Sequence, residues 1–121
     1  MNSHIELGRV GEKFACKEIE KLGYRILERN YRSKLGEIDI IAMDGDVLVF
    51  IEIKTRSSSI DYAKEAVDSK KIKKLQILAL SYIKKKRYEN MRARFDIVAV
   101  CVKDGKPYQI ELIQDAFWCN T

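Results

Sequence analysis

Three acids and one lysine interrupt two otherwise apolar segments in the first half of the chain. Glu37 and Asp39 lie in GEIDIIAM, and Glu52 and Lys54 lie in VLVFIEIK. If the fold brings them together, carboxylates beside an amine could hold a divalent cation and hydrolyse a phosphodiester bond. The spacing leaves open a simpler alternative, a solvent-facing polar stripe in which Glu and Lys are cross-strand partners.

The two segments are expected to form a β-hairpin through Asp44-Gly45, because Asp-Gly is a strong turn signal. Side chains alternate between the two faces of a strand. The first segment is therefore expected to place Glu37 and Asp39 on one face and Ile38 and Ile40 on the other.

The length of the loop decides which residues of the hairpin are direct partners. A two-residue loop places Glu37 opposite Glu52, whereas a four-residue loop places Asp39 opposite Glu52. In either register Asp39, Glu52 and Lys54 lie on one face as direct or diagonal neighbours. A three-residue loop without a bulge would separate them.

Two carboxylates in this arrangement need compensating positive charge. At about 5 Å apart they repel by roughly 3 kcal/mol at an effective dielectric constant near 20. Lys54 can offset part of this repulsion, and a divalent cation offsets more. Asp39, Glu52 and the backbone carbonyl of Ile53 provide the oxygen ligands that Mg²⁺ prefers. Lys54 could then hold a water molecule and favour its hydroxide form.

The hydrophobic pattern predicts the order α-β-β-β-α-β-β for the whole chain. The predicted helices span residues 5–22 and about 62 or 68 to 86, and the predicted strands span residues 24–29, 37–43, 47–54, 94–102 and 108–113. In the first helix Gly8 and Gly11 share the apolar face, which predicts close packing against a neighbour. Glu12 lies at the border of that face, Leu22 lies on it, and Gly23 is a natural helix end.

The totals fit one soluble domain over residues 1–121. The chain is 46% hydrophobic and 34% charged, its formal net charge is +5, and it has no apolar run of the roughly 20 residues that span a membrane. With no signal peptide either, we expect a cytoplasmic protein. The three cysteines are too widely spaced to predict zinc or a disulfide framework. Basic residues cluster at 70–74 and 84–94, which indicates either a nucleic-acid surface or a solvated helix face.

The acidic and basic motifs, read together, resemble the PD-(D/E)XK nuclease signature, and nearly the whole chain resembles the YraN family. The quoted matches are GRVGEKFACKEIEKLGYRILERNYR, GEIDIIA, VFIEIKTR, AVDSKKIKKL and RFDIVAV. The resemblance implies an α/β fold of the restriction-endonuclease-like kind, a three-layer α/β/α core with a mixed central sheet. It also implies similarity to Holliday-junction resolvases.

The resemblance further implies roles for individual residues. Asp39 and Glu52 match the metal-binding acids, Lys54 matches the catalytic lysine, and Glu12 matches an acid of the first helix that completes the site. Glu37 would orient a ligand or act as an additional one. The residues expected to contact nucleic acid are Arg56, Lys70, Lys71 and Lys74.

We therefore expect a Mg²⁺- or Mn²⁺-dependent DNA endonuclease, with branched or structured DNA as a candidate substrate. The alternative is a nucleic-acid-binding protein that uses the same basic surface without cleaving. A homodimer is a further expectation, with residues 108–113 offering an apolar face for self-association. Asp96 is expected to bond a neighbouring backbone group, with a role as an additional site acid as the alternative.

Overall fold

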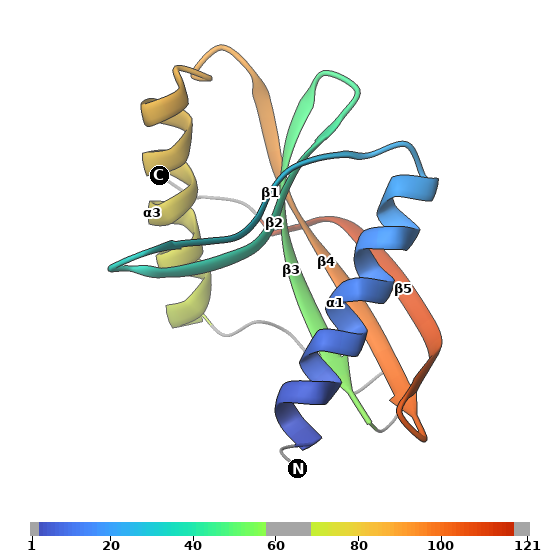
Figure 1. Ribbon diagram of the computed structural model, residues 1–121. Helices are drawn as coiled ribbons and strands as arrows, with labels where there is room; N and C mark the ends of the chain where they lie inside the picture. Colours follow the sequence, from blue (N-terminus) through green and yellow to red (C-terminus); the bar gives the residue numbers. More distant parts are fainter. Residues whose placement is uncertain (1–2, 58–68, 118–121) are drawn as a thin grey trace.

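A mixed five-stranded sheet lies between two helices in the computed structural model, which describes residues 3–57 and 69–117 (Figure 1). The predicted α/β class and the order α-β-β-β-α-β-β are confirmed. The elements are α1 (Ser3–Lys21), β1 (Arg25–Ser33), β2 (Gly36–Asp44), β3 (Val47–Arg56), α3 (Ser69–Lys86), β4 (Arg92–Lys103) and β5 (Lys106–Phe117).

The strands lie in sequence order, β1-β2-β3-β4-β5. The β1–β2, β2–β3 and β4–β5 pairs are antiparallel, and β3–β4 is parallel. A parallel pair needs a crossover connection, and α3 lies between β3 and β4 in the chain. The sheet is therefore mixed, as expected.

Each face of the sheet carries its own hydrophobic core. Residues Ala15, Cys16 and Ile19 of α1 pack on one face. The opposite face packs against α3, and the two helices lie on opposite sides of the strands (Figure 1). The α3 side of that core is Leu75, Leu78, Ala79 and Tyr82, four residues of the predicted apolar stripe. The possible start of this helix near residue 62 lies outside the described residues.

The packing of α1 confirms only part of the prediction for its glycines. A Cβ atom on Gly11 would overlap the side chain of Thr55, so only glycine allows α1 to approach β3 this closely. Within residues 3–57 and 69–117, no atom of another element lies within 4 Å of a Cβ placed on Gly8, and that part of the prediction was wrong. Leu22 was also wrongly assigned to the buried face, because its position after the last helical turn leaves it 61% exposed. Gly23 ends the helix as predicted, at a φ of 96°.

The β2–β3 turn lies one residue later than predicted. Asp44 pairs with Val47, so the two turn residues are Gly45 and Asp46 rather than Asp44 and Gly45. Gly45 adopts a φ of 61°, which glycine reaches without steric cost. The register is the one expected for a four-residue loop, which would place Asp39 opposite Glu52, but the regular ladder ends one pair earlier, at Ile40 and Ile51.

Strand β5 is longer than the predicted segment 108–113 and forms one edge of the sheet. Pro107 belongs to the strand and pairs with Val102 at an irregularity, where a missing N–H is tolerated. Ile110 and Leu112 pack against the α1-side core. Both side chains remain partly buried rather than fully covered, and Tyr108 of the same strand is 58% exposed, so self-association through this strand stays a prediction.

Among the described helices, none is both long and apolar enough to cross a membrane.

Candidate functional site

Strands β2 and β3 part next to Asp39. The last regular pair of their ladder is Ile40 with Ile51. Ile38 packs into the α3-side core, whereas Ile40 packs into the α1-side core. The expectation that these two isoleucines share a face was wrong, because the regular alternation of β2 is interrupted at the residue between them. Asp39 is therefore the residue at which β2 changes which of its side chains point toward α1 and which point toward α3.

Asp39 bridges the gap between the separating strands. Its Oδ2 atom accepts a hydrogen bond of 2.7 Å from the backbone N–H of Ile53. Burial, followed by the negative charge of Glu52, raises the pKa of Asp39 to about 7. The Ile53 N–H and Lys71 oppose this rise but do not cancel it. The carboxyl groups of Asp39 and Glu52 are thus close enough for the charge of one to affect the pKa of the other.

Glu52 has a different cationic partner from the one expected from the sequence. The carboxylate is buried, and its Oε1 atom lies 2.6 Å from Lys71 Nζ. Burial lowers the pKa of Lys71, but the hydrogen bond and charge of Glu52 outweigh burial, and the pKa of this lysine rises. Lys71 of α3, rather than Lys54 of the same strand, therefore forms the short ion pair with Glu52.

Lys54 lies on the same face of β3 as Glu52, two residues further along the strand. Burial and the neighbouring Lys71 ammonium lower the pKa of Lys54. Glu52 acts in the opposite direction without reversing the shift. The neutral amine, which can accept a proton, is thus more accessible in Lys54 than in an ordinary surface lysine.

Glu12 and Asp39 line a common hollow of about 460 Å³. Within it, Glu12 Oε1 accepts a hydrogen bond of 2.9 Å from Asn30 Nδ2 and lies 3.4 Å from Arg29 Nη2. Glu12 therefore reaches the hollow of Asp39, but its carboxylate is held toward β1. The sequence interpretation missed the β1 residues here, although the polar run RNYR was a visible signal.

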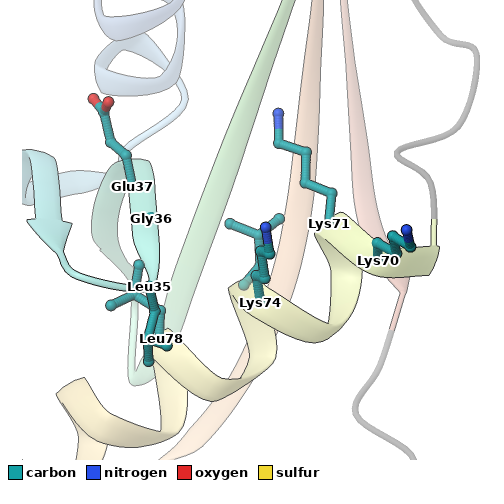
Figure 2. A pocket seen from close by; sticks show the side chains of 8 residues that line it. Leu35, Gly36, Glu37, Lys70, Lys71, Lys74 and Leu78 are labelled. Carbon is teal, nitrogen blue, oxygen red and sulfur yellow. The ribbon is translucent and has the colours of Figure 1, made fainter.

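Glu37 and the expected nucleic-acid-binding residues border two adjoining hollows. Glu37 lines the hollow of Asp39 and also a second one of about 440 Å³, and it forms an ion pair of 3.4 Å with Arg32. Arg56 lines the first hollow, and its Nη1 atom donates to the carbonyl of Thr55 at 2.9 Å. The second hollow is lined by Lys70, Lys71 and Lys74 (Figure 2).

The acids do not form a closed cage. Over residues 3–57 and 69–117, no three Asp, Glu, His or Cys side chains are grouped closely enough to hold a metal ion by themselves. The donor set at the gap between the strands is two carboxylates, Asp39 and Glu52, with the carbonyl of Ile53. Such a set fits Mg²⁺, which commonly takes one or two carboxylates and completes its shell with water and substrate phosphate.

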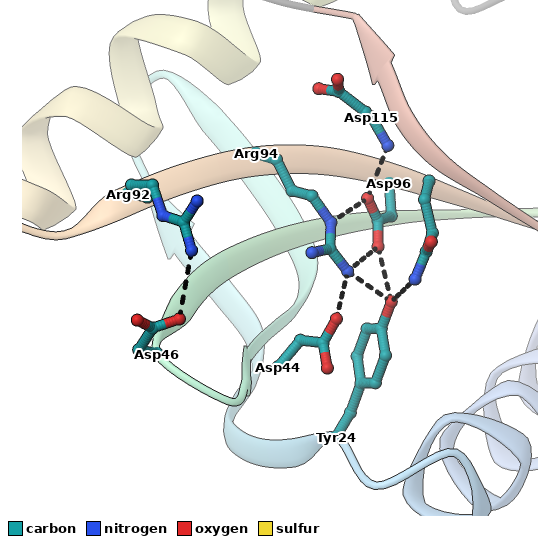
Figure 3. A network of polar contacts seen from close by, with 8 residues as sticks. Tyr24, Asp44, Asp46, Arg92, Arg94, Asp96 and Asp115 are labelled. Atoms are coloured by element: carbon teal, nitrogen blue, oxygen red, sulfur yellow. Dashed lines mark hydrogen bonds and ion pairs between the residues drawn. The ribbon is translucent and has the colours of Figure 1, made fainter.

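Asp96 belongs to a different cluster, which joins several elements through hydrogen bonds (Figure 3). The carboxylate is fully buried and accepts a hydrogen bond of 2.9 Å from the backbone N–H of Asp115. It also accepts hydrogen bonds from Arg94 at 3.0 Å and from Tyr24 at 3.0 Å. The bond to the backbone of Asp115 is the contact expected for Asp96, and none of its contacts given above is with the acids at the β2–β3 gap. This residue is a structural acid of the sheet.

The sequence matches a known family model and close relatives across most of its length. The model described as uncharacterised protein family UPF0102 matches residues 11–100. A UPF0102 protein of Syntrophus aciditrophicus is 45% identical over 97% of this chain and 92% of its own. One from Alkaliphilus metalliredigens is 45% identical over 92% of this chain and 96% of its own. A third, from Pelotomaculum thermopropionicum, is 40% identical over 92% and 94% of the two chains.

Proposed function

The chain belongs to the UPF0102 family, and from the arrangement at the β2–β3 gap we propose that it is a metal-dependent nuclease that hydrolyses phosphodiester bonds in DNA. UPF0102 is the YraN family, so the resemblance read from the sequence is confirmed. The family's description assigns no activity, and the proposal therefore depends on the site. The observation that carries it is the fixing of Asp39 beside Glu52 where the two strands part.

The acid pair favours a divalent cation for an electrostatic reason. Both carboxyl groups are removed from bulk water, and the raised pKa of Asp39 means that its charge is not fully compensated by the protein. Asp39, Glu52 and the Ile53 carbonyl would hold Mg²⁺ or Mn²⁺. When bound, the ion would polarise a phosphate oxygen and lower the pKa of a water molecule.

The chain's own cations have separate tasks in this proposal. Lys54 has a lowered pKa, so its Nζ atom can accept the proton that the attacking water loses. Lys71 Nζ holds Glu52 in place at 2.6 Å. Arg56, Lys70 and Lys74 border the two hollows beside the acids and would contact the phosphates of the substrate on either side.

A second function, nucleic-acid binding without cleavage, is favoured by one observation. Lys71 already neutralises Glu52 through a short ion pair, and the described acids form no group of three that would hold a metal alone. In that case Glu52 would serve to position the Lys71 side chain on the surface that binds nucleic acid. The two functions share the basic residues and differ in whether the acids take part in chemistry.

The experiment is a cleavage assay on single-stranded, duplex, flap and four-way-junction DNA with Mg²⁺, Mn²⁺ or EDTA. We expect metal-dependent products, and Asp39→Asn or Glu52→Gln should lower the rate by about 100-fold or more. Asp46→Asn is the matched control, because Asp46 is an exposed acid of the β2–β3 turn. The cleavage rate of this variant should stay within about twofold of the parent rate. Cleavage that Asp39→Asn leaves unchanged would refute the nuclease assignment. Binding to DNA with no cleavage under any of these metals would establish the second function.

A further inference from the structure

The second hollow combines an apolar floor with a cationic rim (Figure 2). It lies between α3 and the turn that joins β1 to β2, and its volume is about 440 Å³. The floor is formed by Leu35 of that turn together with Leu75 and Leu78 of α3. Leu35 remains 44% exposed, although the other two leucines are buried. The rim carries Lys70, Lys71 and Lys74.

The turn that carries Leu35 has a defined shape. Ser33 Oγ accepts a hydrogen bond of 3.0 Å from the Leu35 backbone N–H. Gly36 follows with a φ of 141°, a conformation that L side chains rarely adopt. Gly36 also lines the hollow, where the absence of a side chain leaves its backbone accessible. The local sequence thus holds an apolar side chain at an exposed tip, facing the helix.

This hollow borders the acid pair. Lys71 lines it, and the Nζ atom of the same residue contacts Glu52 at 2.6 Å. Glu37 lines it as well as the hollow that contains Asp39. A molecule seated on the leucine floor would therefore lie beside the place where a phosphodiester must sit for the proposed reaction.

A nucleotide has the chemistry that fits this combination. The flat faces of its base are apolar and match the leucines, while its phosphate matches the lysines at the rim. The volume falls within the range of about 300–1,000 Å³ that is usual for small-molecule pockets. We propose that this hollow receives the base of an unpaired nucleotide next to the phosphodiester at the acid pair. The position of the phosphodiester rests on the proposed nuclease function, whereas binding of the base does not.

The proposal defines the class of substrate. In a duplex each base is paired at its edge and stacked on both faces, so it can enter a pocket only after it has been extruded, at a cost in free energy. A nucleotide in a single strand, a flap or a branch point has already lost these contacts. We therefore expect preference for nucleic acid with unpaired nucleotides over intact duplex.

The test measures binding in EDTA, so that it does not depend on cleavage. The probes are a fluorescently labelled single-stranded oligonucleotide and a blunt duplex of the same sequence, titrated with the full chain and followed by anisotropy. We expect the single strand to bind about tenfold more tightly. Leu35→Ser should weaken single-strand binding by about three- to tenfold and leave duplex binding unchanged. The control is Leu80→Ser, because Leu80 is a 49% exposed leucine of α3 outside the hollow and should bind as the parent does.

A substrate that carries 2-aminopurine in the single strand reports on the base itself. The environment of a base seated on the leucines should change its emission in the parent protein and in Leu80→Ser, but not in Leu35→Ser. Equal affinity for single strand and duplex, or equal weakening of both by Leu35→Ser, would overturn the inference. Duplex cleavage without single-strand preference would leave the nuclease proposal intact and reject the base pocket. Single-strand preference that is lost in Leu35→Ser, with no cleavage under any metal, would support the pocket and reject the nuclease.

Discussion

Asp39 accepts a hydrogen bond of 2.7 Å from the backbone N–H of Ile53, and this bond joins β2 to β3 just beyond their last regular pair. It holds a carboxylate in the gap between two strands, where Glu52 follows directly on Ile51. The same contact keeps the residue whose carbonyl is a proposed ligand close to the acid. The separation of β2 from β3 therefore fixes the Asp39 carboxyl in a partly buried position near Glu52, where its pKa is raised.

The stability of the metal-free protein should depend on pH through Asp39. The pKa of its carboxyl is about 7 in the folded state against 3.8 for the ordinary group, so the folded state binds the extra proton between these values. Stability conferred by Asp39 is therefore highest at low pH and falls as the pH rises from about 4 to 7, by about 2–4 kcal/mol in total. Urea denaturation across this range should show a slope that Asp39→Asn removes. An equally steep fall in the variant would assign the slope to other groups.

Divalent cations should stabilise the protein above pH 7, where Asp39 is ionised. Mg²⁺ or Mn²⁺ at about 100 times its dissociation constant should add about 2.7 kcal/mol to the free energy of unfolding. The shift in melting temperature should be much smaller in Asp39→Asn and in Glu52→Gln. Asp46→Asn should retain the full shift, because its carboxylate is exposed in the turn. A shift of equal size in all four proteins would place the bound cation elsewhere.

The two glycines of α1 should respond in opposite ways to alanine. Gly11→Ala places a methyl group against Thr55, which should force α1 away from β3 and destabilise the fold by about 1–3 kcal/mol. The methyl group of Gly8→Ala lies within 4 Å of no other element of the described chain, and this variant should stabilise the helix by about 1 kcal/mol. Denaturant midpoints measure both changes. A stabilised Gly11→Ala protein would show that the close approach of α1 to β3 is absent in solution.

Removal of the Lys71 amine should leave Glu52 buried without its short ion pair. We expect Lys71→Ala to lose about 1–2 kcal/mol of stability, less than for a fully buried pair because the lysine side chain is 43% exposed. Added Mg²⁺ should recover more stability in this variant than in the parent, since the cation no longer competes with an ammonium. Lys73→Ala is the control, an exposed lysine of the same helix that lines neither hollow. Identical responses of the two variants to Mg²⁺ would contradict competition at Glu52.

The cluster around Asp96 should affect stability without affecting the site. Tyr24 Oη accepts hydrogen bonds from Arg94 at 2.6 Å and Gln114 at 2.8 Å and donates one to Asp96 at 3.0 Å. Tyr24→Phe removes all three and should cost about 1–3 kcal/mol in thermal or denaturant unfolding. DNA cleavage measured below the melting temperature should stay at the parent rate. A selective loss of cleavage in a stable Tyr24→Phe protein would connect this cluster to the active residues.

Much of the fold could be predicted because its signals are local. The apolar stripe of α3 follows from the 3.6-residue period, and the alternation in β3 places Glu52 and Lys54 on one face. Turn chemistry located the β2–β3 connection to within one residue, although pairing across the strands decided which two residues form the turn. The order of helices and strands required no information beyond these patterns.

The sequence by itself determined the family, the order of the elements and the presence of acids and a lysine in adjoining strands. Only the tertiary structure decided that β2 changes faces at Asp39, that Lys71 rather than Lys54 pairs with Glu52, and that Glu12 is held toward Asn30. It also decided that Leu35 meets α3 to form a hollow. The reason is physical: periodicity reports the burial of each residue within its own element, whereas charge partners and cavities depend on how separate elements pack.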